Sequence, residues 1–178
     1  LVNSASLKAF NWLYYNRQIE HVRYQTMHYD PFFYPLDHIH DWNRMYGPKG
    51  FLQYQCVIPM EHSHSAITEL LNRISRANYG SFLAVLKVFG EVASPGLISF
   101  PRPGTTLALD FPYRGNQTMQ LFDQLDDVVV QAGGALYPAK DANMKAEHFR
   151  LFYPGADQLK TFKDPNITSS FWKRVMEA

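Results

Sequence analysis

Hydrophobic residues recur at helical spacing in two stretches of the chain. The apolar stripes are Ile67, Leu70, Leu71 and Ile74 within residues 61–79, and Leu121, Phe122, Leu125, Val128 and Val129 within residues 117–132. Each stretch is followed by glycine, a residue at which helices commonly end. The pattern predicts two long amphipathic helices that each bury one side.

Shorter stretches between these helices alternate apolar with other residues and are rich in aromatic and β-branched side chains. We expect strands at 50–58, 81–89 and 105–111, and a short strand or loop at 135–141. The order over 50–138 is then strand, helix, strand, strand, helix, strand. This order predicts an α+β fold of the split βαβ, ferredoxin-like type, in which two helices back an antiparallel sheet.

The flanking segments are predicted to be mainly helical. A helix is expected at 4–17, an extended or irregular segment at 22–35, and a short helix at 36–47 that ends at Gly47. Short helices are expected at 143–152, 156–162 and 168–177. This C-terminal tail falls outside the split βαβ unit and should pack against something else.

Alternation along the strands places one set of residues on a common side of the predicted sheet. This set, here called the mixed face, is Phe51, Gln53, Gln55, Val57, Leu83, Val85, Lys87, Phe89, Thr106, Ala108 and Asp110. A few polar groups on an apolar surface are typical of the floor of a binding pocket. An ordinary amphipathic sheet with a hydrated outer side remains the alternative.

Composition narrows the function classes. The 178 residues are 46% hydrophobic, which suffices for the core of one domain. The formal net charge is +1 without a long run of like charge, so a nucleic-acid partner is not indicated. Aromatic residues make up 15% and charged residues 19%, which favours a domain that lines a pocket or buries part of its surface against a partner.

Cysteine and histidine residues give little support to redox or metal chemistry. Cys56 is the sole cysteine and lies in a strand-like run, so we expect a buried structural thiol and no intrachain disulfide. The pairs His38/His40 and His62/His64 lie in a helix-like segment and a turn-like segment, where side chains two apart diverge. Surface or helix-capping histidines, and no metal site, are therefore expected. No phosphate-binding loop, membrane span or signal peptide is visible.

Five blocks of sequence occur in a distinctive order and spacing. They are FYPLDHIHDWNRMYGPKGFLQYQCVIP at 33–59, SFLAVLKVFG at 81–90, LISFPRPG at 97–104, LALDFP at 107–112 and GGALYPAKD at 133–141. In these blocks the chain resembles the vanillyl-alcohol-oxidase-like superfamily of FAD-dependent oxidoreductases, in its branch of polyprenyl-phospho-sugar oxidases. Weaker similarity reaches WLYYNR at 12–17 and FKDP at 162–165.

The resemblance implies a domain organisation. Family members have an N-terminal FAD-binding domain, a substrate-binding (cap) domain and a final segment that returns to the FAD-binding domain. Residues 1–135 would be the C-terminal part of the cap domain, and residues 136–178 the return segment. The chain begins at Leu1 without an initiator methionine, so we expect the C-terminal portion of a longer oxidase. It would lack the part that binds most of the FAD and would be inactive by itself.

The resemblance also assigns roles to residues of this chain. Lys140 matches a lysine that lies near the flavin and is required for activity, so it is the predicted catalytic and cofactor-binding residue. The predicted substrate-binding residues are Gln53, Gln55, Val85, Lys87, Phe89, Thr106 and Ala108. Thr106 and Ala108 stand where the family pattern has asparagine and cysteine, which implies a substrate that differs in detail.

The function that the resemblance implies is oxidation of a secondary alcohol of a sugar to a ketone, as in a polyprenyl-phospho-pentose 2'-oxidase, by hydride transfer to FAD. A partner reductase would complete a two-step epimerisation. The location would be bacterial, cytoplasmic or envelope-associated, with peripheral membrane contact. Two alternatives stay open: an aldonolactone oxidase of the D-arabinono-1,4-lactone type, and a cofactor-free ferredoxin-like binding module.

Overall fold

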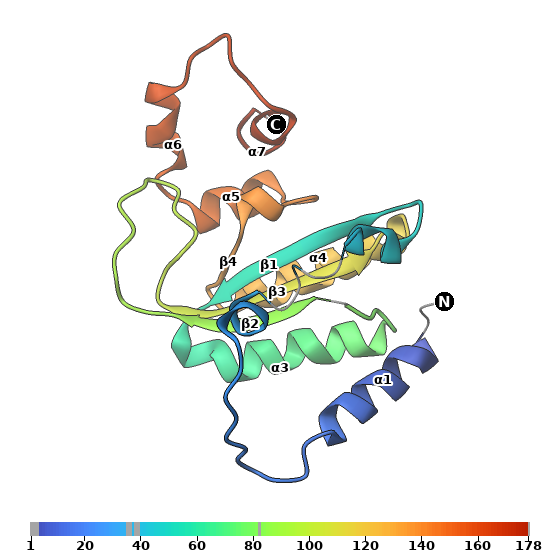
Figure 1. Cartoon of the computed structure of the whole chain (residues 1–178). Helices are drawn as coiled ribbons and strands as arrows, with labels where there is room; N and C mark the ends of the chain where they lie inside the picture. Colours follow the sequence, from blue (N-terminus) through green and yellow to red (C-terminus); the bar gives the residue numbers. More distant parts are fainter. Residues whose placement is uncertain (1–3, 35–36, 38–39, 82, 178) are drawn as a thin grey trace. The chain divides into compact units, whose positions relative to one another are not determined.

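The computed structural model describes residues 4–34, 37, 40–81 and 83–177 of the chain. They form two compact units, one ending at Gly50 and one beginning at Phe51. The predicted α+β class is confirmed, because the second unit carries a four-stranded antiparallel sheet backed by helices (Figure 1).

The first unit contains helix α1 (Ser4–Asn16), helix α2 (Tyr29–Phe33) and the 3-10 helix η1 (Trp42–Tyr46). The helix expected at 4–17 is confirmed. The extended segment expected at 22–35 is interrupted by α2, because His28 caps its first turn and a proline is tolerated there. Of the helix expected at 36–47, η1 is present and ends before Gly47, while residues 36, 38 and 39 lie outside the described residues.

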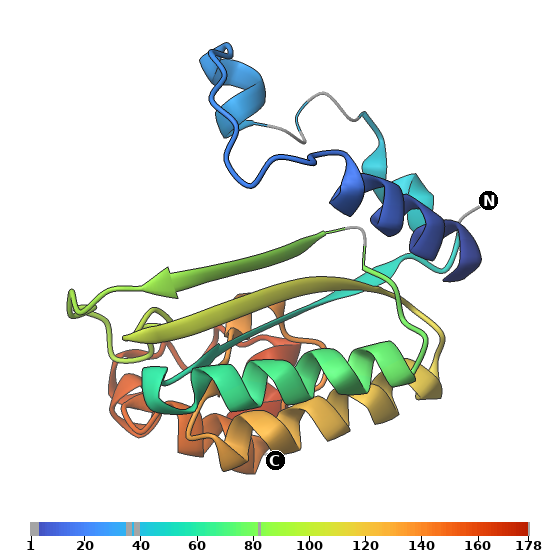
Figure 2. The same ribbon diagram turned by 90° about the horizontal axis from the view of Figure 1, so that it is seen from below.

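The second unit is built on strands in the order β2-β3-β1-β4. The strands are β1 (Phe51–Ile58), β2 (Ala84–Phe89), β3 (Gly104–Pro112) and β4 (Ala135–Leu136). Helix α3 (Met60–Arg76) follows β1, and helix α4 (Asn116–Gln131) follows β3. This is the predicted split βαβ arrangement. Figure 2 shows both helices on the same side of the sheet.

The core lies between the sheet and these two helices. Its buried strand residues include Tyr54, Cys56, Leu107, Leu109 and Phe111, and its buried helix residues include Ile67, Leu70, Leu125 and Val129. Burial raises the pKa of the Cys56 thiol to about 12. Cys56 is therefore an inert core residue, as the sequence predicts.

The helices cover less of the sheet than the alternation pattern suggests. Leu86 and Val88 of the edge strand β2 are 57% and 63% exposed, although they share the apolar side of that strand. Leu71 of α3 is also wrongly predicted as buried, with 44% of its surface exposed. Two helices side by side, each about 10 Å wide, can cover about four strands that are spaced about 4.8 Å apart. They cover all four only if they are centred on the sheet. Here the edge strand β2 extends beyond them.

Gly104, at the start of β3, is required by a close approach of two strands. Its φ is +150°, and a Cβ at this position would lie 2.3 Å from the carbonyl oxygen of Ile58. No other residue fits there without moving β1 away from β3. Glycine at this position therefore lets the central pair of strands close at its end.

The C-terminal tail packs onto the sheet unit. It contains the 3-10 helix η2 (Pro138–Lys140), α5 (Ala146–Phe152), α6 (Ala156–Leu159), the 3-10 helix η3 (Lys160–Phe162) and α7 (Ser170–Met176). Phe149, Tyr153 and Val175 are buried in the same core as the strands. The Tyr153 hydroxyl donates a hydrogen bond to the carbonyl oxygen of Leu136. A boundary at 135/136, with contacts from the tail to a further domain, stays a prediction.

Candidate functional site

The pairing of β1 with β3 places the two predicted pocket glutamines beside residues of the third strand. Gln53 lies opposite Asp110, and Gln55 lies opposite Ala108. Residues directly opposite in an antiparallel pair project from the same side of the sheet. The side chains of all four therefore belong to the mixed face.

The pairing of β3 with β2 extends this face across a third strand. Ala108 lies opposite Val85, and Thr106 lies opposite Lys87. Phe89 follows Lys87 by two residues and so shares its side of the strand. The register thus gathers all seven predicted substrate-binding residues on one face. Whether they bind substrate stays a prediction.

Each glutamine of this face is tied to a buried residue of β3. Gln53 Nε2 donates a hydrogen bond of 3.0 Å to Asp110 Oδ1, and Gln55 Nε2 donates one of 3.1 Å to Thr106 Oγ1. Asp110 and Thr106 are each only 1% exposed, whereas both glutamines are half-buried. The two amides are therefore held at the surface by groups beneath them.

Aromatic rings close one end of the mixed face. Phe89 packs edge-on against Phe100 with ring centroids 6.0 Å apart, and Phe100 stacks on Tyr137 at 4.6 Å. The Lys87 ammonium lies 5.2 Å from the centre of the Phe89 ring. Lys87 is exposed and forms no ion pair within the described part of the chain. Its charge is therefore available to an anionic group.

Lys140 lies on η2 at the opposite edge of the sheet. The backbone N–H of Tyr137 donates to the carbonyl oxygen of Gln55 at 2.9 Å, which fixes the start of η2 against β1. Lys140 is half-buried and lines a pocket of about 20 Å³ together with Gln53 and Gln55. A space of this size holds about one water molecule. Of the ion pairs between described residues, none involves Lys140.

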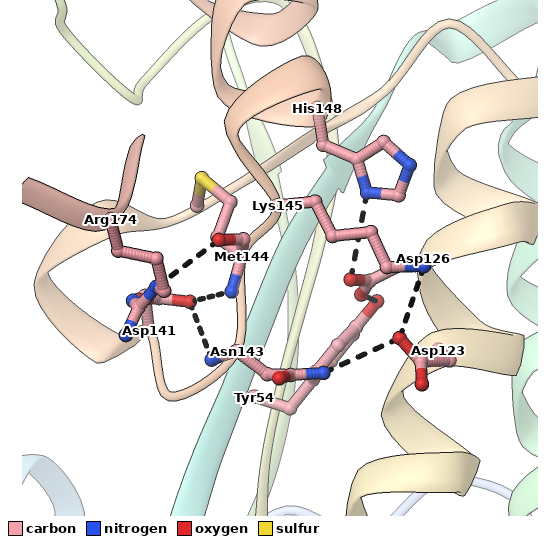
Figure 3. Close-up of polar contacts among 9 residues, drawn as sticks. All are labelled: Tyr54, Asp123, Asp126, Asp141, Asn143, Met144, Lys145, His148 and Arg174. Carbon is pink, nitrogen blue, oxygen red and sulfur yellow. Dashed lines mark hydrogen bonds and ion pairs between the residues drawn. The ribbon is translucent and has the colours of Figure 1, made fainter. Parts of the chain in front are cut away.

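Tyr54 and Asp126 also line this pocket and belong to a buried polar cluster (Figure 3). The Tyr54 hydroxyl donates a hydrogen bond of 2.9 Å to Asp126 Oδ1, and His148 Nδ1 lies 3.8 Å from Asp126 Oδ2. Burial raises the pKa of Asp126 to about 7, against the hydrogen bond from Tyr54, which lowers it. Burial, followed by the nearby Asp126 carboxyl, raises the pKa of Tyr54 well above its usual value.

The segment after Lys140 is anchored by Asp141. Asp141 Oδ1 accepts hydrogen bonds from the backbone N–H groups of Asn143, at 2.9 Å, and Met144, and Oδ2 pairs with the guanidinium of Arg174 in α7. Arg174 Nε also donates to the carbonyl oxygen of Met144 at 3.3 Å. Figure 3 shows these contacts converging on one turn. They fix the chain directly after Lys140.

The structure thus brings Gln53, Gln55 and Lys140 to one pocket and leaves Lys87 two strands away from β1. Sequence reasoning missed Asp126, although a signal existed. Asp126 is a charged residue four positions after Phe122 and directly after Leu125, inside the apolar stripe of α4. A carboxyl at such a position must be buried with a partner or be neutral.

The described residues were compared with the requirements of a metal site and of a membrane-spanning helix. Among the described residues, no group of three or more His, Cys, Asp or Glu side chains is arranged to hold a metal ion. His62 and His64 are exposed on α3, as expected, and His38 lies outside the described residues. The described helices also include none with the length and apolar character needed to cross a bilayer.

Comparison with known proteins tests the resemblance to FAD-dependent sugar oxidases. The chain is 36% identical, over 158 residues, to decaprenylphosphoryl-β-D-ribose oxidase of Mycolicibacterium smegmatis. The predicted resemblance is confirmed. The alignment covers 89% of this chain and 34% of that oxidase. The chain is also 31% identical, over 132 residues, to an uncharacterized protein in the mprA 5' region of Streptomyces coelicolor, which covers 71% of this chain and 35% of that protein.

The chain spans about a third of the length of these curated relatives. It matches no protein-family model. Similarity to decaprenylphosphoryl-β-D-ribose oxidase extends over most of this chain and so includes the strands that carry the mixed face. The individual roles of the site residues stay predictions.

Proposed function

We propose that the chain forms the substrate-binding part of an FAD-dependent oxidase that converts a secondary alcohol of a sugar into a ketone. The proposed substrate class is a polyprenyl-phospho-pentose. The observation that supports this best is the pocket shared by Gln53, Gln55 and Lys140, in a chain similar to an oxidase over 89% of its length. A ketone product of this kind would suit a partner reductase.

The residues fit one edge of a flavin rather than a complete flavin site. The pocket beside Lys140, at about 20 Å³, is far too small for a three-ring system, so the ring would lie outside it. FAD, when bound, supplies the acceptor for the hydride. Lys140 supplies a half-buried cation that no carboxylate of the described residues neutralises. Such a cation stabilises negative charge that develops nearby during the reaction.

The other residues of the mixed face would bind and orient the sugar. The amides of Gln53 and Gln55 are each hydrogen-bonded to a residue of β3 and can exchange further hydrogen bonds with hydroxyl groups. Lys87 is an exposed cation suited to a polar or phosphate group of the substrate. Val85, Ala108 and Phe89 add apolar surface beside these groups. Orientation of the reacting carbon in this way accounts for a large part of catalysis in general.

The test uses the full-length oxidase of which this chain would be the C-terminal portion. The flavin-loaded protein is mixed anaerobically with a prenyl-phospho-pentose, and reduction is measured as the loss of flavin absorbance. We expect the Lys140→Ala variant to be reduced at least about 100-fold more slowly, because it loses the charge at the reaction centre. Lys160→Ala is the matched control. Lys160, on η3, pairs with the exposed Asp157 of α6, and loss of an exposed pair has little effect.

The outcomes separate the proposal from its alternatives. Reduction by the prenyl-phospho-pentose, slowed in Lys140→Ala and unchanged in Lys160→Ala, supports the proposal. Reduction by an aldonolactone alone assigns the other oxidase activity. A full-length protein that cannot be loaded with FAD overturns the oxidase proposal in favour of a binding module.

A further inference from the structure

Asp110 is the one acidic side chain of the mixed face. It lies beside Gln53, on the neighbouring strand β3. Its carboxylate is 1% exposed and accepts the hydrogen bond of 3.0 Å from Gln53 Nε2. The two residues are directly opposite in the register of β1 and β3. The contact is therefore fixed by the sheet itself and does not depend on a flexible loop.

The chemistry of a carboxylate decides which way the Gln53 amide points. The amide nitrogen of Gln53 faces Asp110 Oδ1 at 3.0 Å and donates a hydrogen bond to it, and a carboxyl oxygen that accepts this hydrogen bond repels the amide oxygen. The Gln53 carbonyl oxygen is thereby directed away from Asp110. The hydrogen bond also polarises the amide, which makes this oxygen a stronger acceptor.

Gln55 provides a contrast on the same strand. Its partner is the hydroxyl of Thr106, 3.1 Å from Nε2. A hydroxyl both donates and accepts, so it is compatible with either orientation of the amide. The mixed face therefore pairs one glutamine of fixed orientation with one that can adapt.

We propose that Asp110 is a positioning residue that sets the specificity of the site by holding the Gln53 carbonyl oxygen toward the ligand. In this orientation Gln53 selects a hydrogen-bond donor, such as a sugar hydroxyl, at its end of the site. A keto or ether oxygen at the same place meets an acceptor and is disfavoured. The nature of the ligand rests on the proposed function; the orientation of Gln53 does not.

The first test uses Asp110→Asn in the flavin-loaded protein. The asparagine keeps the shape of the side chain but can both donate and accept, so Gln53 becomes free to reverse its amide. We expect KM for the prenyl-phospho-pentose to rise about tenfold, the effect of losing one oriented hydrogen bond, with kcat nearly unchanged. Asp157→Asn removes an exposed carboxylate elsewhere and should leave both constants unchanged. An Asp110→Asn variant with unaltered KM overturns the proposal.

A double-mutant cycle tests whether Asp110 acts through Gln53. Gln53→Met removes the amide and keeps the length of the side chain. If Asp110 only orients this amide, adding Asp110→Asn to Gln53→Met raises KM no further. A further tenfold rise in the double variant contradicts a positioning role.

A measurement without turnover separates this inference from the proposed function. The side-chain amide of Gln53 gives a pair of NMR signals, and we expect the hydrogen-bonded proton to exchange slowly in the wild type. In Asp110→Asn this protection should fall about tenfold. Lost protection in a protein that oxidises no sugar supports the positioning role while the proposed function fails. Equal protection in both proteins overturns the positioning role, whatever the enzyme assay gives.

Discussion

Asp126 lies in the apolar side of α4, where its carboxyl is 1% exposed and receives a hydrogen bond from Tyr54. Burial favours the neutral carboxyl and raises its pKa from 3.8 to about 7. The titratable groups that face it are His148, Asp123, Asp141 and Lys145. A neutral Asp126 can still accept the hydrogen bond from Tyr54, whereas the buried Nδ1 of His148 has no hydrogen-bond partner among the described residues.

The raised pKa of Asp126 predicts a pH dependence of stability. The folded state holds the Asp126 proton more tightly than the unfolded state, so the stabilisation is fully present below about pH 4 and is lost as pH rises through 7. In Asp126→Asn this loss should be absent. Relative to wild type, the variant should gain about 1–4 kcal/mol in free energy of unfolding between pH 4 and pH 8.

Urea unfolding at several pH values provides the measurement. A second comparison in a His148→Gln background removes the imidazole, whose Nδ1 lies 3.8 Å from Asp126 Oδ2, and leaves the carboxyl in place. Parallel pH profiles for wild type and Asp126→Asn in both backgrounds would falsify the assignment of this pH dependence to Asp126.

Strand alternation predicted which residues share the mixed face, and helix periodicity missed the buried carboxyl of Asp126 nearby. A period of two places Gln53, Gln55 and Asp110 on one side, because every residue of a strand has only two directions to take. Asp126 was missed, since a helical stripe is broad and tolerates one polar member whose partner, Tyr54, comes from a distant strand. Lys140 was assigned to the site by resemblance alone. Its position beside β1 depends on a contact between distant parts of the sequence, which periodicity does not reveal.

Among the elements, β3 depends most on a single residue. Replacing Gly104 by alanine would place Cβ 2.3 Å from the carbonyl oxygen of Ile58, at a φ of +150° that alanine rarely adopts. We expect a loss of about 2–4 kcal/mol in free energy of unfolding. Gly90→Ala is the control, because no atom lies within 4 Å of the added Cβ, and it should change stability by at most about 0.5 kcal/mol. Equal losses in the two variants would contradict the close approach of β1 and β3.

Element boundaries followed the sequence where periodicity was strong. The stretches predicted at 61–79 and 117–132 became α3 and α4 with ends shifted by a few residues. The segment at 135–141 became two residues of strand followed by η2, because Pro138 lacks the N–H that a longer strand would use. The edge position of β2 could not be predicted from its own residues, since strand order is a property of the whole sheet.

At the scale of the whole molecule, the two units differ in how much of each is buried. The second unit has a continuous buried core, whereas residues 17–28 of the first unit are exposed and outside helices and strands. We expect trypsin to cleave after Arg17 and Arg23 before it cleaves within 51–133. Mass spectrometry of short digests gives the order of cleavage. Early cleavage after Arg73 or Arg76 would show that the second unit opens first.

The tie between Asp141 and Arg174 has a consequence for how variants of this protein are interpreted. The catalytic candidate Lys140 sits one residue before an anchor that is held from α7, at the far end of the sequence. A substitution in that last helix can therefore displace the ammonium group and behave as an active-site defect, although it touches no ligand. For this chain, the distance of a substitution from Lys140 along the sequence is a poor guide to its effect. It does not tell whether a loss of function comes from a missing catalytic group or from a displaced one.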